Sequence, residues 1–251
     1  MTKVFVLGAA DPEMEEIERV ARENGHEVRY AMQRGWRVRA ETAYQADNLS
    51  SALPPQAHVI FVECAVWGLT PHDIVDHHQP GDPGYGKPPA EYLYSSSLGQ
   101  ALRIMGLEPT AKQRIIAAAD HCPTQAYRGE CPGVDPADLA EWRTYSRALR
   151  RGVSNTEMEL AIERAKESLL NAEKVDFGDG PIAWVAERGG EIPEASARYG
   201  IPFMYAEPMK DGRTKMGIMG AKPSMIATWM RDCGLARVYG DPVRGYAGGY
   251  L

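Results

Sequence analysis

The chain has 251 residues, of which 44% are hydrophobic and 25% charged, and its formal net charge is −6. This composition is typical of a soluble globular protein that is long enough for one large or two modest cores. The acidic balance argues against a protein that coats duplex nucleic acid, because such proteins carry a basic footprint.

The four cysteines are widely spaced, and residues 1–10 lack the basic and apolar segments of a signal peptide. Both features predict reduced thiols and a cytoplasmic protein. No membrane partner is expected, because no apolar stretch approaches the roughly 20 residues that a membrane helix requires.

Strand and helix patterns alternate in the first part of the chain. Short β-rich or apolar runs predict four strands, at residues 3–9, 27–32, 58–66 and 72–78. Asp11 and Pro12 predict the start of a helix that ends at Gly25, because an N-cap residue is followed by a first-turn proline. We therefore expect an α/β fold with a mostly parallel sheet flanked by helices.

Helical patterns then dominate up to a polar stretch at residues 151–155. Apolar spacing and capping residues predict three helices, between Pro89 and Gly106, from Thr110 to about residue 121, and at residues 136–150. A newly capped helix begins after Gly152, and we place a domain boundary there. The predicted domains are residues 1–152 and 153–251.

The second domain is predicted to be a smaller α+β domain. Its pattern indicates a first helix, then short strands at residues 182–187, 202–207 and 215–219, with Asp211-Gly212 marking a hairpin. A further helix is expected at residues 224–233, followed by a glycine-rich tail at residues 245–249 that we interpret as a loop.

Acidic and imidazole side chains follow successive predicted strands or end a helix. They are Asp11, Glu63, the run Asp76-His77-His78, and Asp120. In an open α/β sheet the carboxyl ends of the strands border one crevice, so these side chains are expected to converge. Carboxylate oxygens mixed with imidazole nitrogens suit Mn²⁺ or a similar divalent ion rather than a structural zinc site.

Other interpretations remain open for single residues. Asp11 is a good N-cap whatever else it does. His121 is expected to be structural or on the surface. A zinc site built from His121, Cys122 and Cys131 has the wrong spacing for a standard finger. The four arginines at helical spacing before Gly152 are interpreted as a solvated face paired with acids, rather than a phosphate site: Arg143, Arg147, Arg150 and Arg151.

The acidic and histidine motifs, and their order along the chain, resemble those of the DHH phosphoesterase superfamily. Asp11-Pro12-Glu13 is similar to the family's Asp-x-Asp motif, Asp76-His77-His78 is its naming motif, and Asp120 matches the fourth motif. The tail around Arg244 is similar to the glycine-rich substrate loop of the family's small second domain. Only the Asp-His-His motif is specific.

The resemblance implies a role for each matched residue. It implies that one or two Mn²⁺ ions bind, with Mg²⁺ or Co²⁺ as alternatives. The metal ligands would be Asp11, Glu13, Glu63, His77 and Asp120. His78 would contact the substrate phosphate, and Asp76 would orient an imidazole. The C-terminal domain would hold the substrate through Arg244, Gly245, Gly248 and Gly249.

The chain also departs from the family pattern. Leu7 stands where members often carry a histidine, a glutamate replaces the second aspartate of the first motif, and Tyr246 stands where a histidine is typical. These departures predict a divergent member in which one metal position is weakened or absent.

The leading functional hypothesis is a cytoplasmic, Mn²⁺-dependent hydrolase that cleaves a phosphodiester or phosphomonoester bond of a small nucleotide or short oligonucleotide. An inorganic pyrophosphatase of the same fold is a second hypothesis, although it would require a strongly basic pocket. A catalytically idle nucleotide-binding or assembly protein is a third, and the sequence leaves a homodimer open. A dinucleotide-binding oxidoreductase is disfavoured, because residues 6–10 lack the Gly-x-Gly-x-x-Gly turn.

Overall fold

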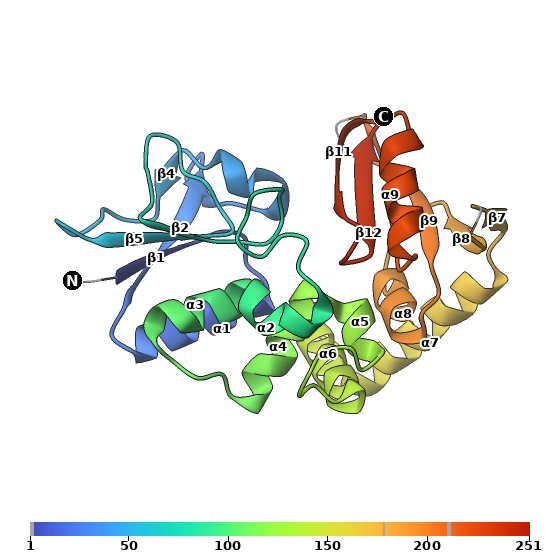
Figure 1. Ribbon diagram of the computed structural model, residues 1–251, viewed down its shortest axis with the longest axis horizontal. Helices are drawn as coiled ribbons and strands as arrows, with labels where there is room; N and C mark the ends of the chain where they lie inside the picture. The colour runs from blue at the N-terminus through green and yellow to red at the C-terminus, as the bar shows by residue number, and fades with distance from the viewer. Residues whose placement is uncertain (1–2, 178, 210–211) are drawn as a thin grey trace. The chain divides into compact units, whose positions relative to one another are not determined.

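A computed structural model describes residues 3–177, 179–209 and 212–251 (Figure 1). These residues form a mixed α/β protein with two six-stranded sheets, one of them mostly parallel, flanked by helices. The expected fold class is confirmed at this level. The chain divides into two compact units, Met1–Lys87 with Glu91–His121, and Pro88–Ala90 with Cys122–Leu251.

The first unit is built on the mostly parallel sheet. Its strands are β1 (Lys3–Leu7), β2 (Glu27–Gln33), β3 (Trp36–Arg37), β4 (Asn48–Leu49), β5 (His58–Val62) and β6 (Asp73–Val75). The order is β3-β2-β1-β5-β6, with β4 also paired to β2. Strands β2, β1, β5 and β6 run parallel, and the short β3 and β4 pair with β2 in the antiparallel sense.

The helices of the first unit are α1 (Pro12–Glu23), α2 (Tyr92–Ser95), α3 (Ser97–Met105) and α4 (Ala111–His121), with the short 3₁₀ turn η1 (Ala40–Gln45). A second 3₁₀ turn, η2 (Pro89–Glu91), has its first two residues in the second unit and Glu91 in the first. In Figure 1, α1 and α3 lie along the same face of the sheet. The core on β1 includes Val4 and Val6, which pack with Phe61 of β5 and Ala43 of η1. Burial on both faces explains the near-continuous apolar character of these strands.

The helix expected between Pro89 and Gly106 is divided in the structure. Ser96 has extended backbone (φ −63°, ψ 152°), and its hydroxyl accepts a hydrogen bond from the Gly99 amide at 3.1 Å. An N-cap residue has non-helical backbone, so the preceding helix α2 ends at Ser96 and α3 begins after it. Gly106 ends α3 with left-handed backbone (φ 74°), as the sequence predicts.

The second unit contains the other sheet, in the order β11-β12-β10-β9-β8-β7. Its strands are β7 (Lys174–Asp176), β8 (Pro181–Val185), β9 (Phe203–Pro208), β10 (Thr214–Met219), β11 (Ala236–Asp241) and β12 (Tyr246–Tyr250). Its helices are α5 (Pro123–Tyr127), α6 (Pro136–Arg151), α7 (Asn155–Asn171), α8 (Ile192–Tyr199) and α9 (Pro223–Asp232). One core joins α7 and α8 to the sheet through Phe203, and a second joins α9 through Ile218.

The division between the units falls between His121 and Cys122, ahead of the boundary expected near Gly152. Gly152 has left-handed backbone (φ 65°) and accommodates the turn between α6 and α7, which pack against each other inside the second unit. The polar stretch at this point is therefore a helix-to-helix turn.

The domain boundary near Gly152 stays a prediction. Two other sequence expectations are corrected by the second unit. The glycine-rich tail is not a loop, because β12 pairs with β10 and places Gly248 opposite Gly217. The arginine stripe is only in part a solvated face: Arg150 and Arg151 are exposed, but Arg143 and Arg147 pair with the fully buried Glu194 of α8. Of the expected Asp211-Gly212 hairpin, Asp211 lies outside the described residues. Among the helices that the structure describes, none has the length and apolar character to cross a membrane.

Candidate metal centre

The acidic and histidine residues of the first unit lie where the parallel strands end. Glu63 directly follows β5, and Asp76 directly follows β6, with His77 and His78 next along the chain. Glu13 lies in the first turn of α1, the helix that follows β1. β1 lies between β2 and β5, so the chain passes from β1 to β2 on one side and later returns to β5 on the other, and ligands gather at such a switch point.

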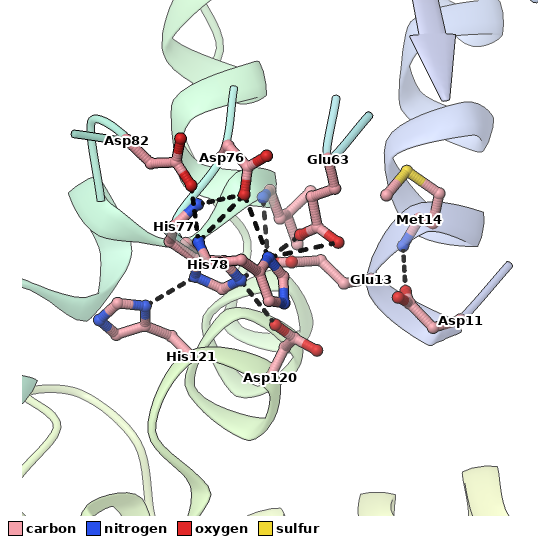
Figure 2. Close-up of polar contacts among 12 residues, drawn as sticks. Asp11, Glu13, Met14, Glu63, Asp76, His77, His78, Asp82, Asp120 and His121 are labelled. Carbon is pink, nitrogen blue, oxygen red and sulfur yellow. Dashed lines mark hydrogen bonds and ion pairs between the residues drawn. The ribbon is translucent and has the colours of Figure 1, made fainter. Parts of the chain in front are cut away.

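His77 is the central residue of this group and is fully buried. Its Nε2 lies 3.4 Å from Oε1 of Glu63 and 3.1 Å from Oδ2 of Asp120 (Figure 2). Two sets of donor atoms in the described residues lie within 4.8 Å of one another: Glu13, Glu63, His77 and Asp120 in one, and Glu63, His77 and His78 in the other. The structure thus brings together four of the five predicted metal ligands.

The donor set fits a divalent cation. Oε2 of Glu13 and Oε1 of Glu63 are buried and have no hydrogen-bond partner among the described residues. Burial raises the pKa of Glu13 well above its ordinary value, and the nearby charges of Asp120 and Glu63 raise that pKa further. Buried carboxylates so close together require a positive charge, and their oxygens with an imidazole nitrogen suit a metal ion.

Glu63 has an unusual backbone conformation, with a φ of 49° in the left-handed region. The predicted strand 58–66 ends at Val62 because this residue turns the chain. Gly8 makes room for the turn, since a Cβ atom there would lie 2.3 Å from the carbonyl oxygen of Glu63. Such strain persists only where the surroundings enforce it, and it concentrates at functional sites.

Asp76 holds the following two histidines in place. Its Oδ1 accepts hydrogen bonds from the amides of His77, at 2.7 Å, and His78, at 3.1 Å, and lies 3.1 Å from Nδ1 of His78. Burial alone would raise the pKa of Asp76, but its contacts with His78 and Tyr44 outweigh burial and lower it. This contact could orient the imidazole of His78, and that role of Asp76 stays a prediction. His78 is 36% exposed and is the accessible histidine of the pair.

His121 contacts the buried histidine directly. It is fully buried at the end of α4, and its Nδ1 lies 2.8 Å from Nδ1 of His77, with the two rings stacked at 5.0 Å. The sequence favoured a structural or surface position for His121 and did not predict this contact. If Nε2 of His77 held a metal, its Nδ1–H would donate a hydrogen bond to Nδ1 of His121.

Asp11 belongs to neither donor set among the described residues. Its side chain accepts a hydrogen bond from the Met14 amide at 2.7 Å and caps α1, the contact drawn from it in Figure 2. Its role as a metal ligand stays a prediction. The neighbouring Glu13 accepts a hydrogen bond from the Leu98 amide at 3.0 Å through Oε1, and this contact helps to fix its carboxylate.

The residues predicted to bind substrate lie in the second unit. Arg244 and Gly245 are in the β11–β12 turn, where the guanidinium of Arg244 lies 5.3 Å from the ring centre of Tyr246. Gly248 and Gly249 are inside β12. Their binding role stays a prediction.

Sequence reasoning missed the residues that support the Asp-His-His segment from a distance. The Tyr44 hydroxyl donates to Oδ2 of Asp76 at 2.9 Å, and Gln100 Nε2 donates to the Asp76 carbonyl at 2.9 Å. Position 84 requires glycine, since a Cβ atom there would lie 1.9 Å from the Ser95 carbonyl oxygen and 2.7 Å from Cβ of His77. For Gly84 the sequence did offer a signal, because it lies in the Gly- and Pro-rich loop that follows His78.

The zinc alternative receives no support from the geometry. Sγ of Cys122 lies 3.2 Å from Sγ of Cys131, but the described residues contain no three-donor set that includes these thiols and His121.

Comparison of the chain with family models and with curated proteins finds no match.

Proposed function

We propose that the protein is a divalent-metal-dependent phosphoesterase that hydrolyses a small nucleotide or a short oligonucleotide. The observation that carries this proposal is the convergence of Glu13, Glu63, His77 and Asp120 on one buried point, beside the more exposed His78. The Asp-His-His resemblance supports the same reaction class.

The four converging side chains would hold the ion, with Mn²⁺ as the expected metal. When bound, such an ion supplies positive charge that polarises a phosphoryl group and lowers the pKa of water. His121 would keep Nε2 of His77 directed at the ion through the contact between their Nδ1 atoms.

His78 would act at the substrate phosphate. Because its Nδ1 faces Oδ1 of Asp76, its Nε2 is the atom that exchanges a proton with the substrate or donates a hydrogen bond to a phosphate oxygen. Asp76 stabilises the protonated ring, and Tyr44 holds Asp76 from the other side.

The test is hydrolysis of a panel of mononucleotides, short oligonucleotides, phosphomonoesters and pyrophosphate with added Mn²⁺. We expect nucleotide or oligonucleotide hydrolysis that EDTA abolishes, loss of bound metal in His77→Ala, and a large fall in kcat with little change of KM in His78→Ala.

His58→Ala is the matched control, because His58 pairs with Asp73 at the start of β5, the opposite end of that strand from Glu63. This variant should keep both metal and activity. Preferential cleavage of pyrophosphate would favour the pyrophosphatase hypothesis, and nucleotide binding without turnover would favour the idle binding protein. An active His78→Ala enzyme would exclude the proposed chemistry.

A further inference from the structure

A surface groove of about 500 Å³ lies in the first unit, between the end of η1 and the segment that follows β5. Its lining includes the aromatic side chains of Tyr44 and Trp67, the apolar Val66 and the polar Gln45 and Asp47. The volume is within the range of small-molecule sites, and an apolar lining with a few polar groups is their usual composition.

The walls of the groove are held by backbone hydrogen bonds. The Ala65 amide donates to the Ala43 carbonyl at 3.2 Å, the Ala46 amide to the Ala65 carbonyl at 3.2 Å, and the Trp67 amide to the Ala46 carbonyl at 2.8 Å. Ala46 and Val66 form a parallel bridge and are both buried. The groove is therefore preformed, so that a ligand would not have to order its walls.

Trp67 is the unusual residue of the groove, because 87% of its surface is exposed although its backbone is fixed. A single exposed apolar side chain is ordinary on a protein surface. An exposed indole that lines a groove together with a tyrosine ring, beside amide and carboxylate groups, is instead the arrangement that stacks a flat heteroaromatic ring and hydrogen-bonds its edge.

The groove is connected to the candidate metal centre through two of its own residues. Tyr44 lines the groove and donates its hydroxyl to Asp76, the residue that orients His78. Trp67 is only four residues beyond Glu63. One residue of the groove therefore contacts the segment that carries His77 and His78, within the same compact unit.

We propose that the Tyr44–Trp67 groove binds the nucleobase of the substrate, by stacking on Trp67. The proposal rests on the phosphoesterase function and deepens it, because it identifies the substrate as a phosphate that carries an aromatic base. Sugar phosphates and pyrophosphate lack the group that the groove holds.

The test compares AMP with ribose 5-phosphate, which has the same phosphate and sugar but no base. Binding is measured by calorimetry with Mn²⁺, and phosphate release is followed in the same samples. The intact protein should bind AMP about 5- to 160-fold more tightly, since stacking of one base is worth roughly 1–3 kcal/mol and about 1.4 kcal/mol is a factor of ten in affinity. Trp67→Ala should reduce this preference to near unity without changing the affinity for ribose 5-phosphate.

Trp36→Ala is the matched control, because Trp36 is 80% exposed but does not line the groove. It should keep the full preference for AMP. An unchanged preference in Trp67→Ala, or no preference in the intact protein, overturns the base site. Dissociation of a dimer by Trp67→Ala in sedimentation, with AMP affinity unchanged, also overturns it and assigns the surface to a second copy of the chain.

The two proposals fail in distinguishable ways. If the protein hydrolyses phosphate esters but shows no Trp67-dependent preference for AMP, the base site is wrong and the phosphoesterase function stands. If Trp67 determines the preference for AMP but no ester on the panel is hydrolysed, the base site stands and the phosphoesterase function is wrong.

Discussion

At the scale of single residues, Glu63 combines a strained backbone with a buried oxygen that has no hydrogen-bond partner among the described residues. Its φ of 49° costs roughly 1–2 kcal/mol in a residue that has a Cβ atom. The conformation is enforced on both sides, since the Glu63 amide donates to the Val75 carbonyl at 3.0 Å and Gly8 leaves space for the Glu63 carbonyl. A residue that served only packing would gain nothing from this arrangement, so the strain supports ligation by Glu63.

Glu63→Gly should therefore stabilise the metal-free protein while it removes metal binding. Glycine relieves the left-handed strain, and the change also removes a buried carboxylate, so we expect a gain of about 1 kcal/mol in the free energy of unfolding. The measurement is urea unfolding in EDTA, with Mn²⁺ affinity by calorimetry. Gln56→Gly is the control, since Gln56 is exposed with a φ of 58° and should gain stability without losing metal. A destabilised Glu63→Gly would contradict the strain argument.

His121 should act on metal affinity through His77. Removing the partner of a ligating histidine typically weakens metal binding 10–100-fold. We expect a loss of this size in His121→Ala, read by competition with a Mn²⁺ chelator, and partial rescue by His121→Asn, whose amide occupies nearly the position of Nδ1. Equal affinities in the two variants would mean that His121 only fills space.

At the scale of elements, ion pairs connect α6 to α8, through arginines that were expected to be solvated. Glu194 is fully buried, accepts hydrogen bonds from Arg143 at 2.7 Å and Arg147 at 3.1 Å, and also accepts one from the Tyr127 hydroxyl. Burial would raise the pKa of Glu194, but the two guanidinium groups outweigh burial and lower it to about 2. The ion pairs therefore depend on an ionised Glu194.

The stability that Glu194 contributes should be lost in acid. Because its folded pKa is depressed, the contribution is complete above the ordinary pKa of 4.5 and declines as the pH falls toward 2. Glu194→Gln should cost about 3 kcal/mol at pH 7, since it removes the fully buried charge that Arg143 and Arg147, both partly buried, share. The cost should shrink at pH 3.

Denaturant unfolding of both proteins at pH 7 and pH 3 measures this difference. Glu163→Gln is the control, because Glu163 pairs with Lys166 on the surface and its loss should matter little at either pH. A cost for Glu194→Gln that does not vary with pH would refute the dependence on ionisation.

At the scale of the whole molecule, metal should stabilise one compact unit selectively. Glu13, Glu63 and Asp120 repel one another in the metal-free protein, and an ion that binds only the folded state adds about 2.7 kcal/mol at 100 times its Kd. Mn²⁺ should slow amide hydrogen exchange in β1, β5 and β6 but not in α7. His77→Ala should remove the effect, and His58→Ala should retain it. Protection that spreads equally over α7, or that persists in His77→Ala, would contradict the site.

The local pattern of the sequence determined the parallel strands of the first unit, several caps and the position of acidic and histidine residues after the strands. Asp11 and Gly106 act within a few residues of the chain, so neighbouring residues are enough to predict their caps. Convergence at the sheet edge followed from parallel pairing alone, because all parallel strands end on the same side.

Only the tertiary structure decided which distant residues meet. His77 and His121 are 44 residues apart, Tyr44 and Asp76 are 32 apart, and each contact depends on how a helix or turn packs against the sheet. The same holds for Gly248, whose position in a strand depends on pairing with β10 and not on local glycine content. Periodicity and capping act over a few residues, whereas packing acts between segments whose separation in the chain carries no signal of their contact.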